Sequence, residues 1–490
     1  MELNVKDVIE VAVVGGGPTG LMLACELALA GIAVTVFERR NEPVQQSRAL
    51  TLHPRSLEVL ALRGWEGPFL ERGKPLPTGH FGMLDTRLDF SALDTAFKFT
   101  LFISQAVTEM LLEERARLLG VDIRRGYEVR ELRQDDEGVD LVGAASGQAF
   151  RCRARYVVGA DGARSIVRQL AGIGFVGTDT SVTAMLGDVV LSEPPSTPAF
   201  STINTRGGIM IVPLSPGIHR LILFDPERMQ VPVKEGVTLD ELRRSVTRIC
   251  GTDLGMRDPQ WLSRFGNETR IAETYKAGRV LLAGDAAHIH FPAGGQGLNV
   301  GLQDAMNLGW KLAGVLRDRA PVSLLDSYHR ERYPVGHALT RNTEAQTALM
   351  ACSPSVLALR DMLSGFLKDP ALNRSLAERL GAMDVVYPDL DVPAPRFEGG
   401  LVTALTGKRL PDLELKLLDG VVRRLYSFMH EGKWLVLQLR GGHGPNVSLD
   451  PAWKGWTNVV QAHPGDDCEE LRGLSGLLLR PDGHVGWAWA

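Results

Sequence analysis

Cysteine is scarce in this sequence and follows no pairing pattern. The 490 residues include five cysteines, which are odd in number and widely separated: Cys25, Cys152, Cys250, Cys352 and Cys468. No C-x-x-C pair occurs. The sequence therefore indicates neither a disulfide framework nor a cysteine-based zinc site, and a reducing, cytoplasmic compartment fits best.

A strong charge of one sign and a long apolar run are also missing. The formal net charge is −4, so composition gives no reason to expect binding to nucleic acid or to an anionic membrane. The most apolar stretch, residues 21–37, contains Glu26 and Gly31, which argues against a membrane span. The acidic start, MELNVKDVIE, lacks the features of a secretory signal. We expect an ordinary globular protein of two to four domains.

The chain is organised around residues 11–20, VAVVGGGPTG. Four apolar residues predict a buried strand, after which Gly15, Gly17 and Gly20 have the spacing G-x-G-x-x-G. In such a turn the first glycine permits a tight bend, the second lets the backbone approach a pyrophosphate, and the third lets the helix pack on the strand. Pro18 suits the first helical turn, where its missing N–H is not needed. The free N–H groups at the helix start would then face phosphates.

The residues that follow support this interpretation. We predict a helix over residues 18–30 that ends at Gly31, then a strand over residues 33–37. Glu38 follows that strand, about 20 residues beyond the glycines, where a carboxylate commonly accepts hydrogen bonds from a ribose hydroxyl. An ordinary βαβ turn without a ligand is the alternative, and the terminal acid favours a dinucleotide site over it.

Two later strands also end in glycine and an acid. A strand at residues 156–158 runs into GADG, which contains Asp161, and a strand at residues 280–283 ends at Gly284 and Asp285. A carboxylate at the end of a strand can hold a polyhydroxyl chain. The glycines at residues 294–297 precede a helix and would let a flat ring lie close to the backbone. Asp161 by itself is equally consistent with a simple helix cap.

The remaining chain divides by texture. Residues 65–100 are rich in loops, and residues 180–270 contain short alternating strands that predict an antiparallel sheet with a helix over residues 237–250. Residues 320–385 are predicted to be helical, and the last hundred or so residues alternate strand and helix patterns. His288 and His290 form H-x-H, but no third ligand is evident, so we predict no metal site.

Three motifs stand in order along the chain: GGGPTG with Glu38, GADG at residues 159–162, and GDAAHIHFPAGGQGLN at residues 284–299. Together they resemble the class A flavoprotein monooxygenases, the aromatic hydroxylases with the p-hydroxybenzoate hydroxylase fold. The likeness covers essentially the whole chain. Within the family, FGNETR at residues 265–270 and LLRPDGHVGWA at residues 478–488 are most similar to bacterial hydroxylases of angucycline- and anthracycline-type polyketides.

The resemblance implies an α/β fold, with a Rossmann-like FAD-binding domain, an inserted antiparallel-sheet substrate domain and a C-terminal thioredoxin-like domain. The FAD-binding domain would comprise residues 1–180, of which residues 65–100 contribute to the substrate lobe, and residues 273–390 after the chain returns. The substrate domain would span residues 181–272. The C-terminal domain would span residues 396–490 and would lack redox cysteines.

The resemblance also implies roles for single residues. The glycines of the first motif would hold the FAD pyrophosphate, Glu38 the adenosine ribose, and Asp285 the ribityl chain, while Asp161 would assist reduction by a nicotinamide. Pro292 and Gly295 would lie near the flavin ring. The expected FAD contacts are Gly15, Gly17, Pro18, Thr19, Gly20, Glu38, Arg39, Arg48, Gln105, Val129, Asp161, Asp285, Pro292, Gly295, Gly297, Leu298 and Asn299. No catalytic base is evident. Arg206, Met210 and Phe224 are candidates to face the substrate, although core or surface positions are equally open for them.

The implied reaction is an aromatic hydroxylation. NAD(P)H would reduce FAD, dioxygen would add at flavin C4a, and the hydroperoxide would transfer OH to an electron-rich ring of a polycyclic phenol. The nicotinamide would bind transiently, because no second G-x-G-x-x-G is present. We expect a monomer or a homodimer. The alternatives are a hydroxylase that inactivates a rifampicin- or tetracycline-type antibiotic, a simple-phenol hydroxylase, a plain NAD-dependent dehydrogenase, and a non-catalytic FAD-binding assembly protein.

Overall fold

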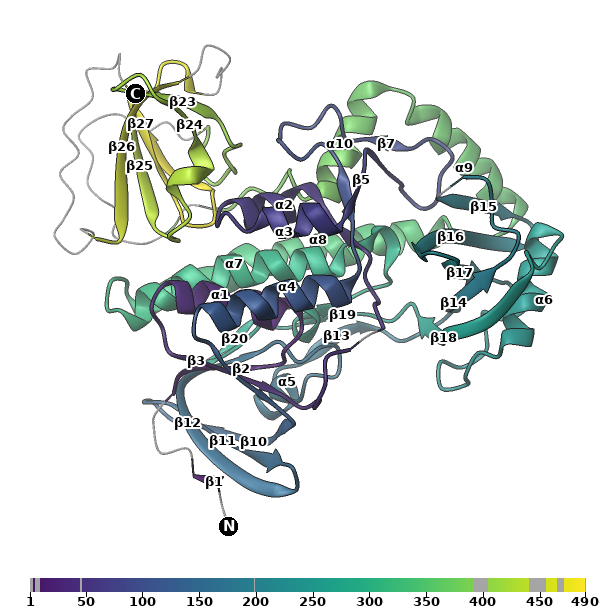
Figure 1. Ribbon diagram of the computed structural model, residues 1–490, viewed down its shortest axis with the longest axis horizontal. Helices are drawn as coiled ribbons and strands as arrows, with labels where there is room; N and C mark the ends of the chain where they lie inside the picture. The colour runs from purple at the N-terminus through teal and green to yellow at the C-terminus, as the bar shows by residue number, and fades with distance from the viewer. Residues whose placement is uncertain are drawn as a thin grey trace.

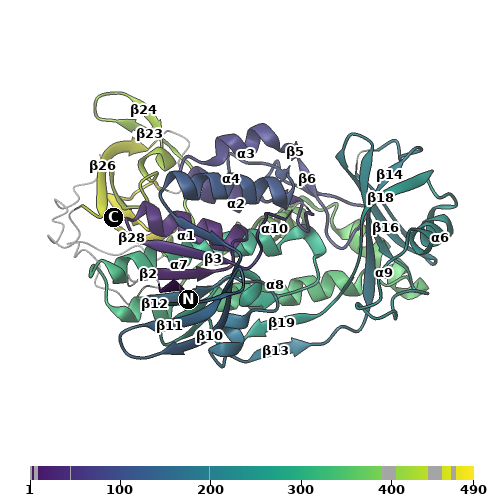
Figure 2. The same cartoon turned by 60° about the horizontal axis from the view of Figure 1, so that its bottom comes forward.

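The three largest sheets occupy separate parts of the molecule. Figures 1 and 2 show a C-terminal sheet at one end, a second antiparallel sheet at the other, and a central sheet with its helices between them. The computed structural model describes residues 3–4, 9–44, 46–197, 199–388, 390, 404–439, 455–464 and 471–489. No helix in these ranges is both long and apolar enough to span a bilayer.

The central sheet has a parallel core. Strand β2 pairs in parallel with β3 and β12, and β12 pairs in parallel with β21, so the ends of β2, β12 and β21 lie side by side. Residues 11–14 of β2 are all buried, as expected for a strand covered on both faces. The strands are β2 (Ile9–Val14), β3 (Val34–Glu38), β9 (Asp122–Arg125), β10 (Tyr127–Gln134), β11 (Val139–Ala145), β12 (Gln148–Gly159), β20 (Lys276–Ala277) and β21 (Val280–Leu282), with β1 (Leu3–Asn4) beside β12.

Helices cover one side of this sheet. Helix α1 (Pro18–Leu29) packs between α4 (Gln105–Leu118) and α7 (Gly297–Leu316). Nearly every residue of α7 is buried, because α1, α2 (Pro54–Ala61) and α8 (Asp326–Ala348) pack around it. The predicted helix over residues 18–30 and the strand that ends at Glu38 are confirmed.

The second sheet is antiparallel throughout, with the strand order β15-β16-β17-β14-β18. Its strands are β14 (Thr183–Leu191), β15 (Phe200–Asn204), β16 (Gly207–Ser215), β17 (Ile218–Phe224) and β18 (Met256–Gly266). Helix α6 (Leu239–Cys250) packs on it and ends at Gly251, whose φ of 85° is the left-handed conformation that glycine adopts readily. The alternating pattern over residues 180–270 and its helix are thus confirmed.

The segments between these sheets hold small elements, and one of them corrects an expectation. Residues 66–72 form helix α3 (Glu66–Arg72) rather than loop, because Pro68 falls in the first turn, where a missing N–H costs nothing. The other elements are β4 (Thr51–Leu52), β5 (Lys74–Leu76), β6 (Thr78–Gly79), β7 (Leu88–Asp89), β8 (Thr100–Phe102), α5 (Ile166–Leu170), β13 (Phe175–Thr178), β19 (Thr269–Ala272), β22 (His288–Ile289), η3 (Val322–Leu325), α9 (Pro354–Phe366) and α10 (Pro370–Gly381).

The C-terminal sheet differs from its prediction. The sequence predicts alternating strands and helices here, but the described residues beyond 403 form strands and the 3₁₀ turn η4 (Leu425–Phe428), and they include no α-helix. The strands are β23 (Glu414–Leu417), β24 (Val422–Arg424), β25 (Trp434–Leu439), β26 (Thr457–Pro464), β27 (Gly476–Leu479) and β28 (Val485–Trp489). Short apolar runs such as these cannot be assigned by periodicity alone. The predicted start of this domain at residue 396 and Cys468 lie outside the described residues.

Candidate active site

The first glycine motif forms the turn between β2 and α1. Gly15 has φ 112°, and a Cβ there would collide with the carbonyl of Ala160. A Cβ on Gly20 would collide with the carbonyl of Gly15, so this glycine lets α1 pack against the turn. A Cβ on Gly17, by contrast, would have no atom within 4 Å. The backbone at the start of α1 therefore faces open space, and Pro18 occupies the first helical position.

Thr19 supports a second part of the site. Its side chain lies where Gly284 and Gly301 approach α1, and a Cβ on Gly284 would be 2.6 Å from the Thr19 hydroxyl. Gly284 also has φ 60°, which again favours glycine. Thr19, a residue of the first motif, thus also packs against the Gly284–Asp285 turn.

Glu38 is fixed at the end of β3. Its carboxylate accepts hydrogen bonds from the Gly16 N–H at 2.8 Å and from the Arg40 N–H at 2.9 Å. The side chain is buried, whereas Arg39 beside it is exposed. The geometry brings the acid next to the glycine turn, as the spacing predicted.

Asp161 caps a short helix and keeps one oxygen free. Its Oδ2 accepts hydrogen bonds from the N–H groups of Ile166 and Val167, at 2.7 and 3.3 Å, at the start of α5. Its Oδ1 is buried without a hydrogen-bond partner among the described residues. Burial raises the pKa of this carboxyl above its usual range. The helix-cap interpretation is therefore confirmed, and one oxygen remains available.

Val129, another residue expected to contact FAD, lies in the core of the central sheet, on β10.

Asp285 lies in the 3₁₀ turn η1 (Gly284–Ala286), directly after β21. It is exposed and makes no hydrogen bond or ion pair within the part of the chain that the structure describes. Desolvation by the neighbouring protein raises the pKa of this carboxyl, and the nearby His288 and Arg48 counter that rise. Arg48 comes from a distant loop, so the fold brings these two charges together.

The loop of Arg48 is tied to two other elements. The Gln105 side chain accepts a hydrogen bond from the Ala49 N–H at 3.2 Å, and the Ser47 hydroxyl accepts one from the Ala106 N–H at 3.0 Å. Arg220, on the second sheet, donates to the backbone carbonyls of Ser47 and Arg48. Gln105 thus positions the loop instead of standing apart from the site.

The glycine-rich segment before α7, residues 288–298, is called the cradle. It comprises β22, Phe291, Pro292, the turn η2 (Ala293–Gly295) and the first residues of α7, Gly297 and Leu298. Gly294 and Gly295 have φ of 72° and 66°, which bends the backbone sharply just before the helix. Asn299 pins this bend, because its amide donates to the carbonyls of Thr51 and Gly295 at 3.0 and 2.9 Å.

His53 is a site residue that the sequence did not reveal. Its Nε2 lies 2.8 Å from the Gly294 carbonyl and its Nδ1 lies 2.9 Å from the Thr100 hydroxyl. The backbone N–H of His53 donates to the side-chain oxygen of Asn299 at 2.7 Å. Burial lowers the pKa of His53 to about 4, so the ring is neutral at pH 7 and can donate to Gly294. A single histidine in a loop gives no signal that could have identified it.

An apolar cluster joins this cradle to the second sheet. Phe291 and Ala293, from the cradle, pack with Phe224, and Met210 lies against the same cluster. The other members are Met83, Ala184 and Met350, with Ile222, Met229 and Phe265 partly buried beside them. Arg206 lies elsewhere: it is exposed in the turn between β15 and β16 and donates to the Ile249 carbonyl at the end of α6.

The two histidines of the H-x-H pattern have separate partners. His288 Nε2 lies 2.8 Å from an Asp304 oxygen, and His290 Nδ1 lies 2.7 Å from the Phe291 carbonyl. Within the described ranges, no group of three His, Cys, Asp or Glu residues could hold a metal ion.

The geometry fits FAD. Open space at Gly17 leaves room for a pyrophosphate at the start of α1, and the free oxygens of Asp161 and Asp285 are unused acceptors. The Thr51 hydroxyl, beside Gly295, is also buried without a partner. Buried polar groups are ordinarily paired, so the orphan oxygens of Asp161 and Thr51 indicate a polar ligand.

Known proteins are similar to this chain over most of their length. Residues 8–343 match the FAD binding domain family, and residues 403–490 match the aromatic-ring hydroxylase C-terminal family. The uncharacterized aromatic compound monooxygenase YhjG of Bacillus subtilis (strain 168) is 50% identical over 98% of this chain and 94% of its own. A rifampicin monooxygenase of Streptomyces venezuelae is 44% identical over 98% of this chain and 95% of its own.

One relative is named as a synthase, and one solved structure is that of a hydroxylase. A dialkyldecalin synthase of Streptomyces rugosporus is 36% identical over 97% of this chain and 95% of its own. The structure of the OxyS anhydrotetracycline hydroxylase from Streptomyces rimosus has a TM-score of 0.88 at 39% identity, covering 99% of this chain and 96% of that one. The chain therefore belongs to the family of FAD-binding aromatic-ring hydroxylases, the flavin-dependent monooxygenases.

Proposed function

We propose that this chain hydroxylates an electron-rich ring of a polycyclic, polyketide-type phenol. The observation that carries the proposal is the apolar cluster in which Phe291 and Ala293 of the cradle meet Phe224 and Met210 of the second sheet. A flat apolar substrate bound there would lie directly beside the glycine-rich bend before α7. The anhydrotetracycline hydroxylase and the rifampicin monooxygenase, whose names denote large polyketide-type molecules, support this substrate class.

We further propose how the chain holds FAD. The start of α1, with Gly15, Gly17 and Gly20, would receive the pyrophosphate, because a helix N-terminus and free N–H groups stabilise negative charge. Glu38 would receive the adenosine ribose, and Asp285, with Arg48 near it, would receive the ribityl chain. The supporting observations are the open space at Gly17 and the unpaired carboxylate of Asp285.

The flavin ring would lie against the cradle formed by Pro292, Gly295, Gly297 and Leu298. FAD, when bound, supplies the redox chemistry by which one atom of dioxygen reaches the substrate. The residues of this chain supply orientation: neutral His53 and Asn299 fix the bend, and the N-terminus of α7 favours negative charge on the ring. The apolar cluster keeps water away from the reacting atoms.

The reductant we propose is NAD(P)H, bound transiently. An open groove of about 530 Å³ lies beside the loop of Arg48 and reaches Trp261 on the second sheet. Its lining residues are Arg40, Glu42, Pro43, Val44, Gln46, Arg48 and Trp261. The two arginines would favour a phosphate-bearing ligand. We also propose that residues 181–272 are the substrate domain and that residues 1–180 and 273–390 together hold FAD.

The experiment that tests this function is the visible spectrum of the purified protein, followed by NADPH consumption with and without a polycyclic phenol such as an angucyclinone. We expect flavin absorption, and NADPH loss that rises with the phenol and yields a product carrying one atom from labelled dioxygen. A protein that cannot bind FAD would refute the proposal. Bound FAD with conversion of substrate but no oxygen incorporation would instead favour a non-hydroxylating FAD protein, the alternative that the dialkyldecalin synthase suggests.

A pair of variants tests the substrate site itself. Phe224→Ala removes a ring from the cluster at the cradle and should raise KM for the phenol without changing FAD affinity. Phe200→Ala is the control, because Phe200 belongs to the same sheet but packs in the separate cluster with α6. Equal KM values for the two variants would contradict the proposed substrate position.

A further inference from the structure

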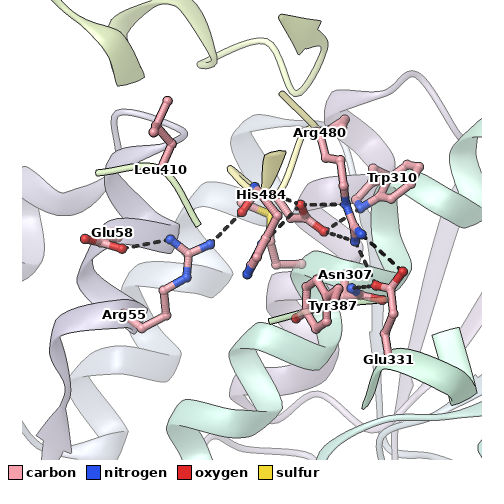
Figure 3. A network of polar contacts seen from close by, with 12 residues as sticks. Arg55, Glu58, Asn307, Trp310, Glu331, Tyr387, Leu410, Arg480 and His484 are labelled. Atoms are coloured by element: carbon pink, nitrogen blue, oxygen red, sulfur yellow. Dashed lines mark hydrogen bonds and ion pairs between the residues drawn. The ribbon is translucent and has the colours of Figure 1, made fainter. Parts of the chain in front are cut away.

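The last hairpin of the C-terminal sheet inserts charged side chains into the helices behind the cradle. The turn between β27 and β28 carries Arg480, Asp482 and His484, which are only 1%, 2% and 3% exposed. Polar and charged residues in hairpin turns are ordinarily solvated, so complete burial of all three requires specific partners. Figure 3 shows Glu331 of α8 and Trp310 of α7 beside Arg480 and its neighbours, and Tyr387 beside His484.

Glu331 of α8 is the centre of those contacts. Its carboxylate pairs with Arg480 and with Lys311 of α7, each at 2.8 Å, and accepts a hydrogen bond from Asn307 at 2.6 Å. Asp482 pairs with Arg480 at 2.6 Å and accepts a hydrogen bond from Trp310 of α7 at 3.0 Å (Figure 3). The hairpin thus locks α7 and α8 together through paired, fully buried charges.

Tyr387 continues these contacts toward the site. Its backbone N–H donates to the Gly407 carbonyl, and the Gly407 N–H donates to the carbonyl of Val485 in β28. The ring centroids of Tyr387 and His484 lie 4.3 Å apart. Its hydroxyl accepts a hydrogen bond from Arg332 Nη1 at 3.0 Å. Arg332 is the next residue after Glu331 in α8, so Glu331 contacts the C-terminal hairpin directly and Arg332 contacts it through Tyr387.

Arg332 in turn holds the N-terminal half of α7. Its Nε donates to Asp304 Oδ1 at 2.6 Å, and its Nη2 donates to the carbonyl of Val300 at 3.2 Å, in the first turn of α7. The other Asp304 oxygen, Oδ2, accepts hydrogen bonds from the Gly284 N–H at 3.0 Å and from His288 at 2.8 Å. Gly284 directly precedes Asp285. A continuous set of buried contacts therefore runs from the hairpin to the turn that carries Asp285: the ring contact of His484 with Tyr387, then hydrogen bonds through Arg332 and Asp304.

We propose that the C-terminal domain is a working part of the flavin site, and that Tyr387, Arg332 and Asp304 are positioning residues that fix the Gly284–Asp285 turn and the start of α7. The inference rests on the proposed role of Asp285 toward FAD. A contiguous set of buried hydrogen bonds can transmit a change at one end to the other, because each member has few alternative partners. Loss of one hydroxyl at Tyr387 should therefore alter flavin binding without any direct contact with FAD.

The test compares two tyrosine-to-phenylalanine variants of the full-length protein. Tyr387→Phe removes the acceptor of Arg332 and keeps the ring against His484. Tyr426→Phe is the matched control, since Tyr426 is also buried and donates one hydrogen bond, to the Leu410 carbonyl at 2.8 Å, whereas Arg332 is bonded to Tyr387. Both variants lose one buried hydrogen bond, so a merely structural role affects them equally.

The measurements are the FAD dissociation constant, and the visible circular dichroism and reduction potential of the bound flavin at saturating FAD. We expect Tyr387→Phe to raise the dissociation constant about fivefold or more and to change both flavin signals, and Tyr426→Phe to change none of them. Equal behaviour of the two variants would overturn the inference. If Tyr387→Phe does not fold, Arg480→Lys, which keeps the charge but loses the paired geometry, is judged by the same flavin signals.

The same experiment separates this inference from the proposed function. If the native protein does not bind FAD, both fall together. If the native protein binds FAD and Asp285→Ala loses it, while Tyr387→Phe behaves like Tyr426→Phe, the proposed function stands and only the positioning role is refuted.

Discussion

Gly17→Val should separate folding from FAD binding. Gly17 has φ −81° and ψ −178°, an extended conformation that any residue adopts, and its Cβ would meet no atom within 4 Å. Replacing glycine stabilises a chain by about 0.4–1 kcal/mol through the unfolded state, and losing glycine at a helix N-cap costs a similar amount. We therefore expect the free energy of unfolding to change by less than about 1 kcal/mol.

FAD binding should respond far more strongly. The valine side chain would occupy the open space at the start of α1 and keep a pyrophosphate from the backbone N–H groups there. A hydrogen bond to a charged group contributes about 1.5–3 kcal/mol, so loss of one raises the dissociation constant about tenfold to hundredfold.

The assay is a fluorescence titration of the FAD-free protein, with its thermal unfolding measured in parallel. Gly236→Val is the control, because Gly236 also has no atom within 4 Å of its Cβ but lies away from the site, before α6. Gly20→Ala should instead impair folding, since its Cβ would collide with the Gly15 carbonyl. A Gly17→Val protein that binds FAD as tightly as the native protein would refute the assignment of this turn to the pyrophosphate.

Three further predictions concern acids. Asp285→Ala should lose FAD, and a variant that purifies with a full complement of flavin would count against the ribityl role. Glu38→Ala should weaken FAD binding and lower stability by about 1–3 kcal/mol, because the Gly16 N–H loses its acceptor; an unchanged FAD dissociation constant would contradict the ribose role. Burial raises the pKa of Glu331, but Arg480 and Lys311 outweigh this and hold it at about 2, below the ordinary 4.5. Its stabilising effect of about 3 kcal/mol is therefore present above pH 4.5 and is lost as the pH falls toward 2. In urea unfolding, the difference between the native protein and Glu331→Gln should shrink over that range, and a constant difference would argue against the shifted pKa.

Local patterns predicted the nucleotide-facing part of the fold well. The strand, glycine turn and helix at residues 11–30 are fixed by neighbours in sequence, because a tight turn needs glycine and a buried parallel strand needs continuous apolar residues. The alternation over residues 180–270 likewise specified an antiparallel sheet, since one face of each strand must be buried. Asp161 and Asp285 were singled out because each follows a strand that ends in glycine, and the family resemblance implied their roles.

Other parts could not be predicted from local patterns. Some of the C-terminal strands were predicted to be helices, because a short apolar run is compatible with the residue spacing of a helix and of a strand. Only pairing in the sheet decides between the two. Arg206 was a plausible substrate contact by residue type, but the β15–β16 turn directs it toward α6. His53 gave no signal, because its contacts with Gly294 and Asn299 join residues more than 240 positions apart in the chain.

The sequence by itself determined which residues can form the glycine turns, which strands are buried, and the family to which the motifs point. The tertiary structure alone decided what lies behind the site. Arg48 approaches Asp285 because Gln105 and Arg220 hold its loop, and the C-terminal hairpin reaches Glu331 because α7 and α8 pack side by side. Such contacts depend on charges that are buried in pairs from distant segments. In the sequence, these arginines and glutamates look like any others. Only folding brings each of them next to its partner.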